Sequence, residues 1–164
     1  MVLEQVAFDI ETTGFDVDDE VTTVGFAVPM GVRVFLQTDG RDMLGVESRV
    51  ESAVSETLVN VSTHASEQEL LVAVSEFVAD RFSDSDVLLV AYNGECWNGG
   101  FDLPFLRTRL ATADLEWPFP ELPYADLLPV VDDLFNTTVD GEAVTTLPGA
   151  YAALCDGELN AIDP

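Results

Sequence analysis

Two carboxylates stand two residues apart at the end of a short apolar stretch. Asp9 and Glu11 flank Ile10, and in a β-strand the side chains of residues i and i+2 point to the same face. The carboxylates are therefore expected on one face and Ile10 on the core face, with the Thr-Thr-Gly of residues 12–14 ending the strand. Such oxygen ligands suit Mg²⁺ or Mn²⁺, which keep waters and bind phosphates. The pair predicts a metal site open to substrate, and the alternative is a solvated strand end in an acid-rich chain.

A third carboxylate, Asp102, follows a second apolar stretch. Residues 87–91 are Val-Leu-Leu-Val-Ala, a continuous apolar run that favours a parallel strand buried on both faces. Asp102 then opens a predicted helix that has Pro104 in its first turn. Because Asp at the head of a helix is also an ordinary N-cap, a metal ligand and a cap are both open interpretations.

The sequence around these carboxylates resembles a known family. Phe-Asp-Ile-Glu-Thr-Thr-Gly at 8–14 resembles the first motif of the DEDD superfamily of 3′ to 5′ exonucleases. Tyr-Asn-Gly at 92–94, followed by Phe-Asp-Leu-Pro at 101–104, resembles the second motif of the exonuclease domains of family-B DNA polymerases and their free-standing relatives. The gap between these two parts is longer than in that family. Either Asn93, at the strand tip, or Asn98, at the shorter spacing, could therefore be the family's Asn.

The resemblance implies a ribonuclease H-like fold and hydrolysis of phosphodiester bonds in DNA or RNA from a free 3′ end. Two Mg²⁺ or Mn²⁺ ions would be held by Asp9, which bridges them, by Glu11 on the ion that carries the attacking water, and by Asp102 on the second ion. The candidate substrate-binding residues are Thr12, Thr13, Asn93, Asn98, Phe101 and Arg107. For Arg107 and its neighbour Arg109, pairing with surface acids is an equal alternative. The runner-up function is a non-catalytic relative of the same fold that binds nucleic acid or a protein partner.

The family's third motif, a Tyr or His four or five residues before a fourth Asp, has no copy in the chain. Tyr151 stands five residues before Asp156, one position more than the Tyr form of the motif has, and the pair comes too early in the chain. Asp126 resembles an Asp that often starts the segment after the second motif, a structural position more than a ligand. We therefore expect residues 1–164 to form a single domain that ends before its third-motif helix, with the gene continuing beyond it.

The remaining pattern predicts an α/β fold with a mixed five-stranded sheet, a three-strand antiparallel meander plus parallel strands, flanked by helices. Ser66 and Glu69 form a capping box at the head of an amphipathic helix. The polar stretch 38–65 is expected to hold only a short helix. Strands are predicted at 2–10, 21–28, 32–37, 87–91 and 124–127, and helices at 46–57, 66–82, 102–110, 128–135 and 147–155.

The charge of the chain is extreme. Asp and Glu number 31 against six basic residues, all of them Arg, which gives a net charge of -25 in 164 residues. In dilute buffer such a surface repels itself and nucleic acid, whereas at about 1 M salt the Debye length falls to ~3 Å. The scattered acids thus predict a halophilic protein from a salt-rich cytoplasm, and the alternative is a protein that binds cationic partners. Neither a signal peptide nor a membrane-spanning run is present, so a cytoplasmic location without membrane contact is expected.

Overall fold

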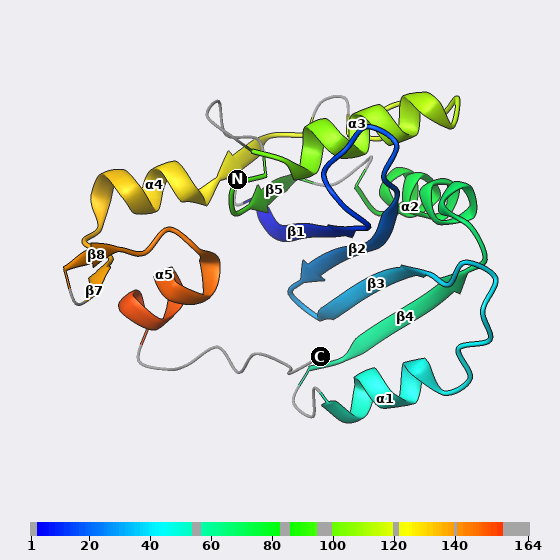
Figure 1. Cartoon of the computed structure of the whole chain (residues 1–164), viewed down its shortest axis with the longest axis horizontal. Coiled ribbons are helices and arrows are strands. Elements are labelled where there is room, and N and C mark those ends of the chain that lie inside the picture. The colour runs from blue at the N-terminus through cyan, green and yellow to red at the C-terminus, as the bar shows by residue number, and fades with distance from the viewer. Residues whose placement is uncertain are drawn as a thin grey trace.

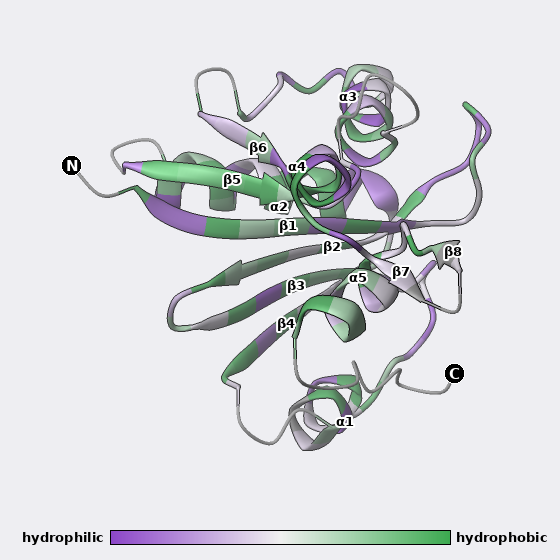
Figure 2. Cartoon of the chain, turned by 90° about the vertical axis from the view of Figure 1, so that its left-hand side faces the viewer, coloured by the Kyte–Doolittle hydropathy of each residue, from purple (hydrophilic) through white to green (hydrophobic). Residues whose placement is uncertain are grey.

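One mixed sheet organises the molecule, whose computed structural model describes residues 3–53, 57–82, 86–94, 100–119, 122–139 and 141–155. Within these residues six strands follow the order β4-β3-β2-β1-β5-β6 (Figures 1 and 2). The strands are β1 (Glu4–Thr12), β2 (Val21–Val28), β3 (Gly31–Gln37), β4 (Val59–His64), β5 (Val87–Ala91) and β6 (Tyr124–Asp126). β2 pairs antiparallel with β1 and β3, and the other pairings are parallel. The expected α/β class and the antiparallel meander are confirmed.

The core lies between this sheet and two helices, α2 (Glu67–Phe82) and α3 (Asp102–Thr112), which contribute to the same buried cluster. Phe26 of β2 is fully buried near its centre. Its ring contacts the rings of Phe8, Phe35, Phe77, Phe82 and Phe119 at centroid distances of 5.3–6.3 Å. Because burying one such side chain stabilises a fold by about 1.5–3 kcal/mol, this cluster stabilises the packing of β1 and β2 against the helices.

The predicted capping box forms at the start of α2. Ser66 Oγ accepts a hydrogen bond of 3.3 Å from the Glu69 backbone N–H, and Glu69 Oε2 accepts one of 2.9 Å from the Ala65 N–H. The Glu side chain thus reaches one residue further back than the pattern requires. Both bonds satisfy backbone donors that a helix leaves without partners.

The expected number of strands is wrong, because β4 lies inside the polar stretch. Val59 and Val61 are buried on β4 while Asn60 is exposed, an alternation typical of a half-buried strand. β4 pairs with β3 in parallel and extends the sheet at its edge. Before it, α1 (Val46–Ala53) covers the first part of the predicted 46–57 helix, residues 54–56 are outside the described part, and Thr57 is not helical.

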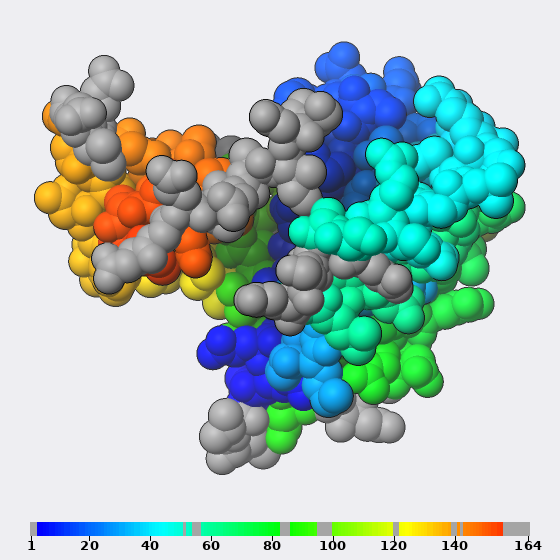
Figure 3. Space-filling view, turned by 90° about the horizontal axis from the view of Figure 1, so that it is seen from below, coloured from blue at the N-terminus to red at the C-terminus, as the bar shows by residue number. Residues whose placement is uncertain are grey.

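The C-terminal elements lie beside the sheet rather than on it (Figures 1 and 3). They are α4 (Leu127–Leu134), the hairpin β7 (Thr138–Val139) and β8 (Glu142–Ala143), and α5 (Leu147–Leu154). No side chain of these elements belongs to the buried cluster of the described core. One link to the sheet is Tyr92, whose hydroxyl donates a 2.8 Å hydrogen bond to the Thr145 carbonyl. Across all the described residues, no helix has the length and apolarity needed to cross a lipid bilayer.

Candidate metal centre

The three neighbouring strands β1, β5 and β6 are parallel, so their carboxyl ends meet at one edge of the sheet. This edge is where ligands bind in open α/β sheets. On β1, Asp9 and Glu11 are exposed and Ile10 is buried, which confirms the predicted alternation. β1 continues past Ala7, its last residue paired with β5, and carries both carboxylates beyond the paired part of the sheet. Asp126 is the last residue of β6 at the same edge.

Asp102 is the first residue of α3 and does not cap it. The N-cap is Phe101, which makes no side-chain capping bond, so the capping interpretation of Asp102 is wrong. A cap at residue 102 would accept the amide of residue 104 or 105, but Pro104 has no N–H and the Phe105 N–H donates to the Phe101 carbonyl at 2.9 Å. At the head of the helix the Phe101 N–H donates to the Asn93 carbonyl at 3.3 Å and the Leu103 N–H to the Gly94 carbonyl at 3.1 Å.

The electrostatics of Asp102 place it among the other carboxylates. Its pKa is raised from the usual 3.8 to about 7, first by burial and then by the negative charges of Asp9, Asp126 and Glu11, in that order of importance. The pKa of Asp9 is raised as well, first because packed atoms remove part of the hydration of its carboxylate and then by the charge of Glu11. Each cause that raises these pKa values is lost hydration or a like charge, which disfavours ionisation.

This donor set fits a hard divalent cation. Asp9, Glu11 and Asp102 bring oxygen atoms to one edge, and a bound ion would reduce the repulsion that contributes to the raised pKa of Asp102. Among the described residues, no three His, Cys, Asp or Glu side chains are gathered closely enough to hold a metal ion. Binding of Mg²⁺ or Mn²⁺ by these carboxylates therefore stays a prediction.

Asn93 lies at the tip of β5 in a left-handed backbone conformation, with φ of 63°. Asn adopts this conformation more readily than most residues because its short polar side chain bonds locally. Through the two carbonyl bonds of residues 93 and 94, the chain on both sides of residues 95–99 is brought together at the head of α3. Although the sequence gap between them is longer than in the exonuclease family, Asn93 therefore lies beside Phe101. Asn98, the other candidate, lies outside the described residues.

Gly94 is required at this turn by close packing. A Cβ at this position would lie 2.6 Å from the Ala91 Cβ, 2.8 Å from the Tyr124 hydroxyl oxygen and 3.7 Å from Oδ2 of Asp102. The first two separations are too short for any side chain. The same distances show that the Tyr124 hydroxyl and the Asp102 carboxylate both lie against this glycine.

The hydroxyls of Thr12 and Thr13 shape the loop that follows β1. Thr12 Oγ1 donates to the Gly14 carbonyl at 2.6 Å. Thr13 Oγ1 donates to Asp19 Oδ1 at 3.0 Å and accepts from the Glu20 N–H at 3.0 Å. Both hydroxyls thus have partners within the loop, and their contact with substrate stays a prediction.

Phe15, which the motifs did not single out, packs against Phe101, the residue before Asp102. It is 84% exposed, and its ring meets that of Phe101 edge to face at 5.1 Å. Phe101 is the residue before Asp102, so the aromatic pair joins the loop after β1 to the head of α3. The sequence did carry a signal for this residue, since Phe15 is an aromatic residue directly after the first motif.

The two arginines of α3 have different partners. The guanidinium of Arg107 lies 4.6 Å from the centre of the Trp117 ring, and its predicted contact with a phosphate is not tested by this arrangement. Arg109 instead forms an ion pair with Glu67 at 2.6 Å. For Arg109 the pairing alternative is therefore correct.

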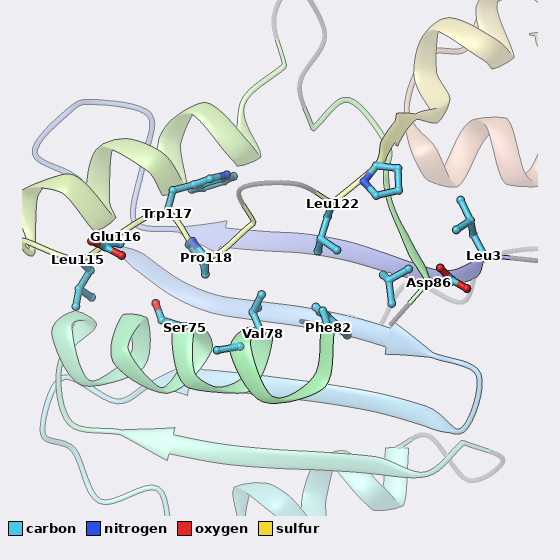
Figure 4. A pocket seen from close by; sticks show the side chains of 13 residues that line it. Leu3, Ser75, Val78, Phe82, Asp86, Leu115, Glu116, Trp117, Pro118 and Leu122 are labelled. Carbon is cyan, nitrogen blue, oxygen red and sulfur yellow. The ribbon is translucent and has the colours of Figure 1, made fainter. Parts of the chain in front are cut away.

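The apolar cavity of about 710 Å³ lies away from these carboxylates (Figure 4). Trp117 and Pro118 face Ser75, Val78 and other residues of α2 across it. Asp86 and Val87, at the amino end of β5, also line it, whereas the carboxylates lie beyond the carboxyl end. None of the four carboxylates lines this cavity, so it is not part of the candidate metal centre.

Comparison with known proteins adds no relative: no family model matches the chain, and no curated protein is significantly similar to it.

Proposed function

We propose that this protein is a metal-dependent 3′ to 5′ exonuclease with a ribonuclease H-like fold. The observation that carries the proposal is the placement of Asp9 and Glu11, on the end of β1, and of Asp102, at the head of α3, at the edge where three parallel strands end. The strand order β3-β2-β1-β5-β6, with β2 reversed, is compatible with that fold. The motif resemblance supplies the reaction class, and the crowded carboxylates support a metal ion as the group that binds there.

Each carboxylate has a distinct origin in the proposed site. Asp9 and Glu11 come from one face of β1, and Asp102 comes from the head of α3. Bound Mg²⁺ or Mn²⁺ would supply charge neutralisation for the phosphate and an activated water. The chain's own part is to hold its carboxylates at fixed positions on rigid elements, so that the phosphate is oriented before reaction.

The terminal nucleotide would lie against the aromatic pair Phe15 and Phe101. Stacking of a base on an aromatic ring contributes about 1–3 kcal/mol and does not depend on base identity. The exposed ring of Phe15 offers such a surface next to the carboxylates. With a net charge of -25, the protein needs screening by salt before a polyanion can approach.

The test is degradation of a 5′-labelled linear single strand, DNA and RNA in parallel, with Mn²⁺ in molar KCl. A 3′ to 5′ exonuclease gives a ladder of shortened products and leaves a circular strand intact. Asp9→Asn should reduce the rate by about 100-fold or more, since one lost charge-stabilising group commonly has that effect. Asp80→Asn, which removes the same charge from the exposed side of α2, is the matched control.

Cleavage of the circle would indicate an endonuclease of the same fold. Tight binding of the strand without cleavage would support the non-catalytic alternative and overturn the proposed activity. Equal rates for Asp9→Asn and the wild type would place the reaction elsewhere in the chain.

A further inference from the structure

Asp126 holds together three parts of the chain at the carboxyl edge of the sheet. Its Oδ1 accepts hydrogen bonds from two backbone amides, the Asn93 N–H at 2.8 Å and the Leu128 N–H at 3.0 Å. Its Oδ2 lies 3.4 Å from the Tyr124 hydroxyl, which donates to it. The carboxylate therefore caps α4 and at the same time anchors the turn that follows β5.

From this turn the contacts continue to Asp102. The Asn93 and Gly94 carbonyls accept the Phe101 and Leu103 amides, the donors on either side of Asp102 in the chain. Oδ2 of Asp102 lies against Gly94, as does the Tyr124 hydroxyl. One continuous set of hydrogen bonds thus runs from Asp126 through the 93–94 turn to the head of α3.

We propose that Asp126 is a positioning residue, which fixes the left-handed turn at Asn93 and thereby sets the place of the Asp102 carboxylate. This inference rests on the proposed function in that the positioned carboxylate is taken to bind metal. It assigns Asp126 a role distinct from that of a metal ligand, because Oδ1 already accepts two amides. Residues that hold a ligating carboxylate in place typically contribute about 10- to 100-fold to metal affinity.

Two substitutions separate positioning from ligation. Asp126→Asn keeps an Oδ1 that can accept both amides, and it removes the charge. Asp126→Ala removes the acceptor altogether. Thr146→Ala is the matched control, since Thr146 Oγ1 accepts the Gly149 amide at the N-terminus of α5 and has no part in the 93–94 turn.

The first measurement is hydrogen exchange of single amides by NMR in the metal-free chain. Asp126→Ala should speed exchange at Phe101 and Leu103 by about 10-fold or more, because these amides lose the fixed carbonyls that accept them. Asp126→Asn and Thr146→Ala should leave both rates unchanged. Unchanged rates in a folded Asp126→Ala chain would overturn the proposal.

The second measurement is titration with Mn²⁺ alone. Affinity should fall about 10- to 100-fold in Asp126→Ala and stay within about 3-fold of wild type in Asp126→Asn. Loss of binding in Asp126→Asn with normal amide exchange would identify Asp126 as a ligand and overturn the positioning role, even if Asp126→Ala fails to fold. A wild-type chain that binds Mn²⁺ but degrades no strand would overturn the proposed exonuclease and support this inference if the variants behave as stated.

Discussion

Arg109 and Glu67 form a part-buried ion pair that joins α3 to the first turn of α2. The Arg109 Nη2 and Glu67 Oε2 atoms are 2.6 Å apart, and each side chain is only 11% exposed. Glu67 Oε1 also accepts the Val21 amide at the start of β2, and Arg109 Nη1 donates to the Val17 carbonyl in the loop after β1. The pair therefore fixes the loop that carries Phe15 against the helix that carries Asp102.

Removing one partner of this pair should destabilise the protein strongly. Arg109→Ala leaves the part-buried Glu67 without its counter-charge, and the cost should lie between about 1 kcal/mol for an exposed pair and about 3–5 kcal/mol for a fully buried one. Unfolding by urea in molar KCl measures the change. The control is Arg41→Ala, whose pair with Asp39 is 77% and 78% exposed, and which should cost under about 1 kcal/mol. Equal losses for the two variants would show that the buried pair has no special role.

The affinity for Mn²⁺ should rise with pH through about 7. Asp102 keeps its proton to about pH 7 in the folded chain and to about 3.8 in the unfolded chain. In the folded chain a proton and a cation therefore compete for Asp102 below about pH 7, and binding there should release a proton. Calorimetric titration in buffers from about pH 6 to about pH 8 checks this against Asp102→Asn, whose weaker binding should lack the step. A flat wild-type profile would contradict it.

The same pKa has a consequence for stability without metal. Because the folded pKa of Asp102 is raised, the folded state binds the proton more tightly than the unfolded state does. The contribution of Asp102 to the stability of the fold is thus fully present below about pH 3.8 and is lost as the pH rises through about 7. Asp102→Asn should remove this loss, so the variant should be more stable than the wild type at pH 8 in chelator.

Phe15→Ala should weaken substrate binding with little effect on folding. The side chain is 84% exposed, so its removal exposes no core, while loss of one stacking surface corresponds to about 1–3 kcal/mol. The weaker binding should appear as a higher KM for a single-stranded substrate. Met30→Ala, at a side chain 83% exposed in the turn between β2 and β3, is the control. An unchanged KM would remove Phe15 from the substrate site.

Thermal stability should increase with KCl. At a net charge of -25, repulsion across the surface opposes the compact state, and salt screens it. Raising KCl from about 0.1 M to about 3 M should raise Tm by at least about 5 °C. Sucrose at matched osmolality controls for exclusion of solute from the surface. A constant Tm would contradict the halophilic interpretation.

The strands that carry the site could be predicted because their signals are local. Asp9 and Glu11 follow from the period of a strand, and Val21–Val28 was predicted with the bounds that it has. β4 was missed because its two buried valines alternate with polar residues inside a longer polar stretch, so its pairing with β3 decided its structure. A strand at the edge of a sheet depends on such long-range pairing more than on its own sequence.

The site's internal links could not be predicted for the same reason. Asp102 has the sequence of a helix cap, but the helix begins one residue earlier, and the Phe105 amide that Asp102 would have bound donates to the Phe101 carbonyl instead. Likewise, the partner of Arg109 is 42 residues away. Residue type and spacing identify the carboxylates, whereas the backbone contacts that place them depend on the complete fold.

The two backbone bonds that join residues 93–94 to the head of α3 also have a consequence for protein engineering. These bonds tie the 93–94 turn to Phe101 and Leu103, so the chain closes a loop between them. Lengthening that loop should cost about 0.6 kcal/mol of closure entropy for each doubling of its length. A fluorophore or an affinity sequence inserted there, with Asn98 kept, would then lie next to the head of α3.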